Sequence, residues 1–169
     1  KTLIILFFTL FSAYSEIIKE IKIDGNSRVS IETIKVFSGI KINQDLSLKQ
    51  LNNIVKNLYE TKYFKDVSIT VDDNILYIKV LENPIIQKLI FEGVKNKRIL
   101  KVLSDQVEMK EKTPFVEVKV KYDEQKITNI LRANGYYFSK VSSKLKYNDN
   151  KTVDLIFDIN LGKKAFIKK

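Results

Sequence analysis

The chain has 169 residues, of which 44% are hydrophobic and 30% are charged, a balance typical of one or two small folded domains. It contains no cysteine, no histidine and only five widely spaced glycines, which excludes disulfides, thiolate or imidazole metal sites and Gly-rich nucleotide-binding loops. The formal net charge is +10, yet only three of the 30 basic residues are arginine, the side chain that nucleic-acid readers favour. We therefore expect no catalytic residues, no metal, no cofactor and no nucleic-acid partner.

Residues 1–15 have the pattern of a secretory signal peptide. One lysine precedes the apolar stretch Leu3–Phe11, and the small residues Ala13 and Ser15 form a cleavage pattern in front of Glu16. The apolar stretch is about half as long as the roughly 20 residues that a membrane-spanning helix needs. We expect cleavage between Ser15 and Glu16 and export of the mature chain, with an uncleaved anchor or a buried N-terminal helix as the alternatives.

An internal repeat organises the rest of the chain. The sequence IIKEIKIDG (Ile17–Gly25) is matched by IIQKLIFEG (Ile85–Gly93). Further on, LYETKYFKDV (Leu58–Val67) is matched by LRANGYYFSKV (Leu131–Val141) with one inserted residue. Self-similarity at a fixed spacing is the signature of repeated structural units.

The repeat sets the expected domain boundaries. It predicts a first unit over residues 16–83 and a second unit over residues 84–162. The tail of the chain lines up with the start of the second unit, so residues 163–169 are interpreted as the truncated start of a third unit. A unit of about 70 residues closes only a marginal core by itself, and contact with a neighbour should help it.

The first unit begins with a strand, Ile17–Ile23, and continues with two helices. Ser30 is expected to cap the first helix, and Gly39 to end it. The second helix begins with a capping box formed by Ser47 and Gln50. Its apolar residues recur at helical spacing and predict one buried stripe, made of Leu48, Leu51, Ile54, Val55 and Leu58.

A hairpin follows the second helix. Both of its strands alternate between apolar and polar residues, which predicts that one face of the sheet is buried and the other is solvated. The first hairpin strand contains Val67, Ser68, Ile69, Thr70 and Val71. The second is built on the apolar residues Leu76, Ile78 and Val80. The turn between them is Asp72-Asp73-Asn74.

The second unit repeats this order. Its first strand is Ile85–Phe91, a short helix covers about Lys97–Leu103, and a second helix ends at Asn134-Gly135. The first strand of its hairpin contains Val141, Ser142, Ser143, Lys144, Leu145, Lys146 and Tyr147. The second strand, Val153–Ile159, follows the turn Asn148-Asp149-Asn150. We therefore predict an α+β fold of tandem β-α-α-β-β units, in which two helices cover one face of a three-stranded mixed sheet.

Tandem units of this kind behind a signal peptide resemble the POTRA (polypeptide-transport-associated) domains. The resemblance covers nearly the whole mature chain and rests on IKIDGNSRV (residues 21–29), LYETKYFKDV, LENP (residues 81–84) and LRANGYYFSKV. It implies a periplasmic scaffold of an outer-membrane protein assembly factor, or of a related secretion or translocation barrel, and not an enzyme. A basic nucleic-acid-binding module is the alternative from another functional class.

The resemblance also implies where partners bind. In the POTRA family the first strand of the hairpin is the sheet edge implied in binding, which here is Val67–Val71 and Val141–Tyr147. An edge strand presents unpaired backbone groups to which an extended chain can add. The implied partners are unfolded outer-membrane protein precursors and other subunits of the assembly complex, and the lysines could also face an anionic membrane surface. Four polar residues of these strands are candidate positions for a proline test: Ser68, Thr70, Ser142 and Lys144. A proline at such a position should block strand addition if the N–H group of the replaced residue points away from the sheet.

Several other groups of residues have simpler interpretations than a functional site. Turn chemistry explains the two hairpin turns better than cation binding does. Asp123 and Glu124 are adjacent on a helix and do not face each other, so favourable helix N-terminal charge is expected rather than an acid/base pair. The aromatic residues Tyr63–Phe64 and Tyr136–Phe138 lie at equivalent corners, where we expect packing rather than platforms for nucleic-acid bases.

Overall fold

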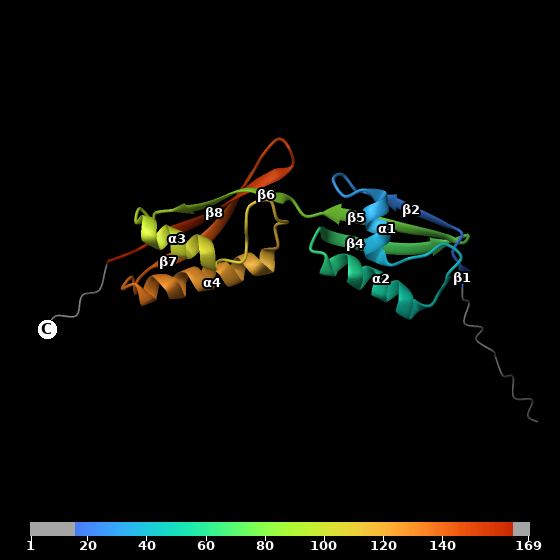
Figure 1. Cartoon of the computed structure of the whole chain (residues 1–169), viewed down its shortest axis with the longest axis horizontal. Helices are drawn as coiled ribbons and strands as arrows, with labels where there is room; N and C mark the ends of the chain where they lie inside the picture. The colour runs from blue at the N-terminus through green and yellow to red at the C-terminus, as the bar shows by residue number, and fades with distance from the viewer. Residues whose placement is uncertain (1–15, 164–169) are drawn as a thin grey trace, which may run out of the picture. The chain divides into compact units, whose positions relative to one another are not determined.

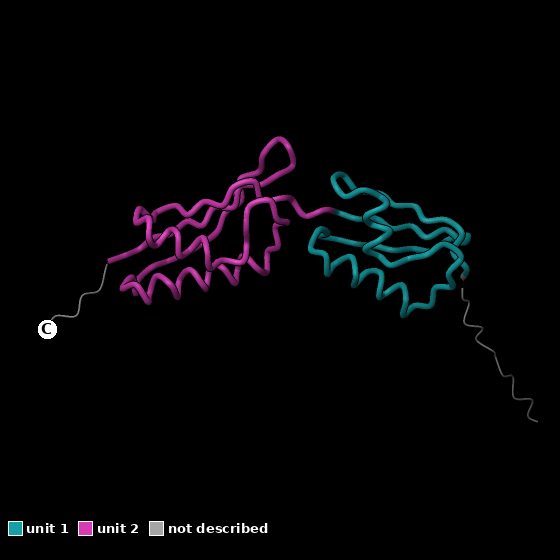
Figure 2. The backbone as a smooth tube through the Cα atoms, in the orientation of Figure 1, with its two compact units in different colours: residues 1–81 teal, residues 82–169 magenta. Residues whose placement is uncertain are grey.

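The computed structural model describes residues 16–163 and divides the chain into two units, one ending at Leu81 and the other beginning at Glu82 (Figure 2). Each unit is described here by itself. The expected signal peptide, residues 1–15, lies outside the described residues, and so do residues 164–169 of the expected third unit.

The first unit contains two helices and a three-stranded sheet (Figure 1). Its elements are β1 (Glu16–Ile17), β2 (Glu20–Asp24), α1 (Ile31–Ser38), β3 (Asp45–Leu46), α2 (Leu48–Glu60), β4 (Phe64–Asp72) and β5 (Ile75–Glu82). The strand order is β2-β5-β4, and β2 runs parallel to β5. A two-residue turn at Asp73 and Asn74, both with positive φ, joins β4 to β5 and makes this pair antiparallel.

The first strand is divided, which corrects the expectation of one strand over Ile17–Ile23. β1 pairs with β3, whereas β2 pairs with β5. Between them, the Ile18 N–H donates to the Gln44 carbonyl (3.1 Å), and the Ile18 carbonyl accepts from the Asn43 N–H (2.8 Å). These bonds join Ile18 to a loop that is distant in sequence. At Ile18, which is fully buried, the chain leaves its pairing with β3 and begins its pairing with β5.

The predicted helix ends of the first unit are confirmed. The Ser30 hydroxyl accepts from the Thr33 N–H (3.1 Å), and Gly39 ends α1 at φ 70° in the left-handed region. Ser47 and Gln50 form both bonds of the capping box at the start of α2. The predicted apolar stripe is confirmed at Leu51, Ile54 and Leu58, which pack in the core. It is wrong at Leu48, the first residue of α2, which is 80% exposed, and Val55 is only half-buried.

The second unit has the same order without the short β1–β3 pair. Its elements are β6 (Ile85–Glu92), α3 (Lys97–Gln106), α4 (Glu117–Ala133), β7 (Lys140–Tyr147) and β8 (Thr152–Asn160). The strand order is β6-β8-β7, with β6 parallel and β7 antiparallel to the central β8. The predicted fold class, tandem β-α-α-β-β units with three-stranded mixed sheets, is therefore confirmed.

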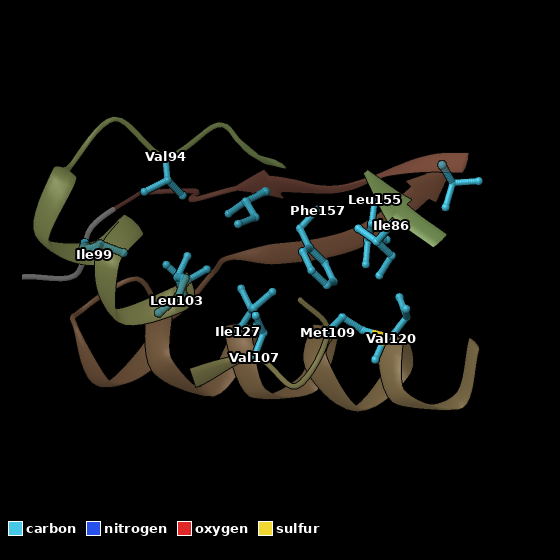
Figure 3. Packing of buried hydrophobic residues seen from close by; sticks show 13 residues of the cluster. Ile86, Val94, Ile99, Leu103, Val107, Met109, Val120, Ile127, Leu155 and Phe157 are labelled. Atoms are coloured by element: carbon cyan, nitrogen blue, oxygen red, sulfur yellow. The ribbon is translucent and has the colours of Figure 1, made fainter. Parts of the chain in front are cut away.

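The core of each unit lies between the helices and one face of the sheet. In the second unit Phe157 and Leu155 of β8 point toward α4, where Ile127 and Val120 point back at them (Figure 3). All four side chains are at most 2% exposed. Burial of this kind is the main source of stability, and it fixes which face of each edge strand is turned to solvent.

Candidate functional site

The strand order places β4 and β7 at a sheet edge in their units, with β5 and β8 at the centres. The residues named above for client binding, Val67–Val71 and Val141–Tyr147, therefore lie on edge strands. Each sheet has a second edge, formed by β2 in the first unit and by β6 in the second. Which of these edges can accept another chain depends on what already covers them.

The connection between α3 and α4 occupies part of the β6 edge. The Ile86 N–H donates to the Thr113 carbonyl (2.9 Å), and the Lys112 N–H donates to the Ile86 carbonyl (2.7 Å). Farther along β6, the Leu89 N–H donates to the Glu111 carboxylate (3.2 Å). β7 has β8 as its only strand neighbour within residues 16–163. β7 is therefore the less covered edge of the second sheet.

The hydrogen-bond register shows which groups of β7 point outward. Beside the turn, the Asn148 N–H donates to the Thr152 carbonyl (3.0 Å), so this pair is hydrogen-bonded across the hairpin. In an antiparallel ladder, hydrogen-bonded and non-hydrogen-bonded pairs alternate. By the register of β7 against β8, the residues whose N–H groups face away from β8 are Val141, Ser143, Leu145 and Tyr147.

This register corrects the proline positions suggested by the sequence. Ser142 and Lys144 have even positions, so their N–H groups face β8, and a proline there would break the sheet instead of blocking its edge. In the first unit, the Val67 N–H donates to the Tyr59 hydroxyl of α2 (3.2 Å) and therefore points away from β5. By the same alternation Ser68 and Thr70 donate into the sheet.

Two helix side chains reach these edges. The Tyr59 hydroxyl accepts from the Val67 N–H and donates to the Asp66 carboxylate (3.0 Å). In the second unit, the Glu124 carboxylate of α4 accepts from the Ser143 N–H (2.7 Å). We call Tyr59 and Glu124 the edge acceptors. The sequence does not point to Tyr59, and it suggests only a favourable helix charge for Glu124. Their positions, late on α2 and midway along α4, are the one signal that they could reach the sheet.

Glu124 is 15% exposed and also pairs with the Lys121 ammonium (3.0 Å). Burial alone would raise the pKa of its carboxyl. Hydrogen bonds from Ser143 and Lys121 and the charge of Lys121 outweigh burial and hold the pKa below its usual value. Glu124 is therefore an anionic acceptor for a backbone donor at the β7 edge.

This shifted pKa predicts a pH dependence of stability. Because the folded-state pKa of Glu124 lies below the unfolded value, its contribution is present above the unfolded pKa and is lost as the pH falls through the folded pKa. Urea unfolding of the chain at several pH values between about 3 and 6 should show a steeper loss of stability in the native chain than in Glu124→Gln. Glu60→Gln, which changes an exposed carboxyl on α2, is the control. If the free energy of unfolding fell equally steeply with pH in the native and Glu124→Gln chains, the lowered pKa of Glu124 would be contradicted.

Asp123 and Glu124 do not form an acid/base pair, and helix N-terminal charge does not describe them either. Asp123 is fully buried, and its two carboxylate oxygens accept from the Glu108 N–H (2.7 Å) and the Met109 N–H (2.8 Å). It fixes the start of the connection that covers β6. The adjacent carboxylates thus bind different segments, Asp123 the connection that follows α3 and Glu124 the edge strand β7.

The turn residues serve the sheet. The Asn74 amide donates to the Ile17 carbonyl (2.9 Å), and the Asn148 amide donates to the Asp154 carboxylate (3.1 Å). Within residues 16–163 no three acidic side chains are grouped in a way that could hold a metal ion. In the same range, no helix combines the length and the apolar character that crossing a membrane requires.

The aromatic corners differ between the units. Tyr63 stacks on Phe37 with ring centroids 6.0 Å apart, and Phe64 is buried, as expected for corner packing. In the second unit Tyr136 packs against the core, but Tyr137 and Phe138 are 59% and 70% exposed. The expectation of packing is therefore wrong for these two side chains.

Comparisons with known proteins agree with this architecture. A family model described as POTRA, surface antigen variable number repeat, matches residues 84–162. The outer membrane protein assembly factor BamA of Neorickettsia risticii is 30% identical over 114 residues, which cover 68% of this chain and 15% of the relative. BamA of Nitratidesulfovibrio vulgaris is 23% identical over 160 residues, which cover 90% of this chain and 20% of the relative. This chain thus spans a fifth or less of these relatives.

A solved structure extends the likeness to the fold. The N-terminal domain of Omp85 from Thermosynechococcus elongatus has a TM-score of 0.55 at 16% identity. The match covers 83% of this chain and 61% of the Omp85 chain. At this identity the likeness concerns the fold alone.

Proposed function

We propose that this tandem of POTRA domains, which resembles BamA in sequence, is a periplasmic scaffold of an outer-membrane protein assembly factor. It binds unfolded β-barrel precursors and partner subunits by strand addition at β4 and β7, and it has no catalytic role. In this proposal the protein as a whole lies in the outer membrane, with the described segment in the periplasm. The BamA relatives are named as assembly factors, and the POTRA match supports the domain type.

One observation carries the proposed mechanism. In the second unit the connection between α3 and α4 covers the β6 edge at Ile86 and Leu89, while the β7 edge keeps outward backbone donors at Leu145 and Tyr147. Strand addition relies on backbone groups, so one edge can accept clients of many sequences. That property suits a scaffold that must hold different unfolded precursors.

The lysine-rich surface supports a second role in positioning. At a net charge of +10, the chain is attracted to anionic lipid headgroups over roughly 8 Å at physiological salt. This attraction would hold the scaffold near the membrane into which its clients are inserted. It would not select a client, because it is independent of the backbone of the edge strand.

A proline at Tyr147 tests the strand-addition mechanism. Tyr147 is 74% exposed and its N–H points away from β8, so Tyr147→Pro removes one outward donor without disturbing the core. Losing this hydrogen bond and adding the ring should weaken binding of an unfolded outer-membrane-protein peptide to β7 by about tenfold. The affinity is read from the amide shifts of β7 during titration.

Two controls make this result specific. Tyr147→Ala keeps the backbone donor and should bind as the native chain does. Lys146→Pro removes a donor that faces β8 and should lower the thermal stability of the second unit. Equal binding by Tyr147→Pro and the native chain would contradict strand addition at β7.

A further inference from the structure

Each proposed binding edge has one outward backbone donor that is already bonded. In the first unit it is the Val67 N–H, which donates to the Tyr59 hydroxyl (3.2 Å). In the second unit it is the Ser143 N–H, which donates to the Glu124 carboxylate (2.7 Å). A carbonyl of an added strand would need these same hydrogens, since strand addition uses the outward donors of the edge.

The edge acceptors are not copies of one repeated feature. In the repeat, Leu58 matches Leu131, so Tyr59 corresponds to Arg132, and Glu124 corresponds to Leu51. The bonded donors also differ in position, because Val67 corresponds to Val141 rather than to Ser143. Two unrelated side chains therefore reach the same kind of backbone group at different places along equivalent strands.

We propose that the edge acceptors set the register of strand addition. An added strand pairs with the donors that lie beyond the acceptor, which are Leu145 and Tyr147 on β7 and Ile69 and Val71 on β4. This inference rests on the proposed function, and it names which part of each edge the partner occupies. The partner is an extended segment that runs alongside the turn-proximal half of each strand.

The chemistry of the acceptors predicts that the two edges differ in how firmly they fix the register of an added strand. Displacing Glu124 would take a charge-assisted hydrogen bond from a carboxylate that is only 15% exposed, and would leave that charge poorly solvated. Displacing Tyr59 would free a neutral hydroxyl that keeps its bond to Asp66. The β7 register should therefore be held more firmly than the β4 register.

The test uses the whole chain, three variants of the edge acceptors and two matched control variants. Glu124→Ala removes the acceptor of the second unit, and Tyr59→Phe deletes only the hydroxyl of the first. Glu124→Gln keeps a neutral oxygen acceptor, so it should still protect Ser143, but less strongly than the native carboxylate does. The matched controls are Glu60→Ala, which loses only an exposed ion pair with Lys56, and Tyr122→Phe, which changes a tyrosine that is 70% exposed on α4.

Two measurements are made on each chain. Amide hydrogen exchange of the free protein reports whether the acceptor protects its donor, and we expect Ser143 to exchange about tenfold faster in Glu124→Ala. Exchange is then repeated with a saturating acetylated dodecapeptide of alternating valine and threonine, flanked by lysines. In the native chain the peptide should newly protect Leu145, Tyr147, Ile69 and Val71. In Glu124→Ala new protection should extend to Ser143, and in Tyr59→Phe to Val67.

The outcomes separate this inference from the function on which it rests. If Ser143 and Val67 exchange equally fast in native and variant chains, the acceptors protect nothing and the inference is overturned. If the peptide adds protection at Leu145 but the variants leave its extent unchanged, strand addition stands and the register inference fails. If the peptide protects no residue of β4 or β7 in any chain, the proposed function fails, and the inference fails with it.

Discussion

Ile78→Asp should unfold the first unit. Ile78 lies on the central strand β5, is 1% exposed and belongs to the core cluster beneath the helices. A carboxylate there has no partner to compensate for its lost hydration, and the substitution should cost about 4 kcal/mol of a total stability of about 5 to 15 kcal/mol for a domain. Thermal unfolding followed by circular dichroism should show an early transition that accounts for the first unit.

Leu81→Asp is the matched control for this change. Leu81 lies on the same strand but is 54% exposed, so its replacement leaves the core intact. The thermal transition of Leu81→Asp should stay close to that of the native chain. If Ile78→Asp melted as the native chain does, the sheet face assigned to the core would be wrong.

Gly93→Ala should have a comparably large effect on the second unit. Gly93 has φ 87°, and a Cβ atom there would lie 1.9 Å from the carbonyl oxygen of Ile159 on β8. Backbone cannot give way as a side-chain end can, so the strand pairing must shift, at a cost of about 3 kcal/mol or more. Gly25 stands in the same relation to Val80 in the first unit, with the corresponding distance 2.0 Å.

Gly39→Ala distinguishes the steric overlap of an added Cβ atom from the strain of a positive φ. Gly39 also has a positive φ, 70°, but the nearest atom to its added Cβ would be 3.8 Å away. Its replacement by alanine should cost only about 1 kcal/mol. Denaturant unfolding of the two variants should show this difference, and similar losses for Gly93→Ala and Gly39→Ala would mean that the close approach to Ile159 has no energetic weight.

Local patterns in the sequence predict most of the fold. The capping box at Ser47 and the glycine at Gly39 depend on residues within one helical turn, and both lie where the sequence predicts them. The division of the first strand could not be predicted, because it depends on backbone bonds from Ile18 to Asn43 and Gln44, far away in sequence. The exposure of Leu48 was missed since periodicity alone does not say where a buried stripe begins.

The candidate site shows a similar limit. Alternation along Val141–Tyr147 predicts which side chains face the helices, but it does not say which N–H groups face outward. That information comes from the register, which begins at the bond between Asn148 and Thr152. The contact of Glu124 with Ser143 joins residues 19 positions apart, from a helix to an edge strand. No local pattern encodes such a contact.

Strand addition at the sheet edges is tested most directly by mapping the amide shifts of the chain with an unfolded outer-membrane-protein peptide at low and at high salt. Strand pairing predicts contiguous shifts within Val67–Val71 or Val141–Tyr147, largest in the half nearer the turn, that persist at high salt, because backbone hydrogen bonds are not screened as exposed charges are. Shifts scattered over the lysines and abolished by salt would mean that charge attraction alone binds the peptide, and would contradict the edge-strand mechanism.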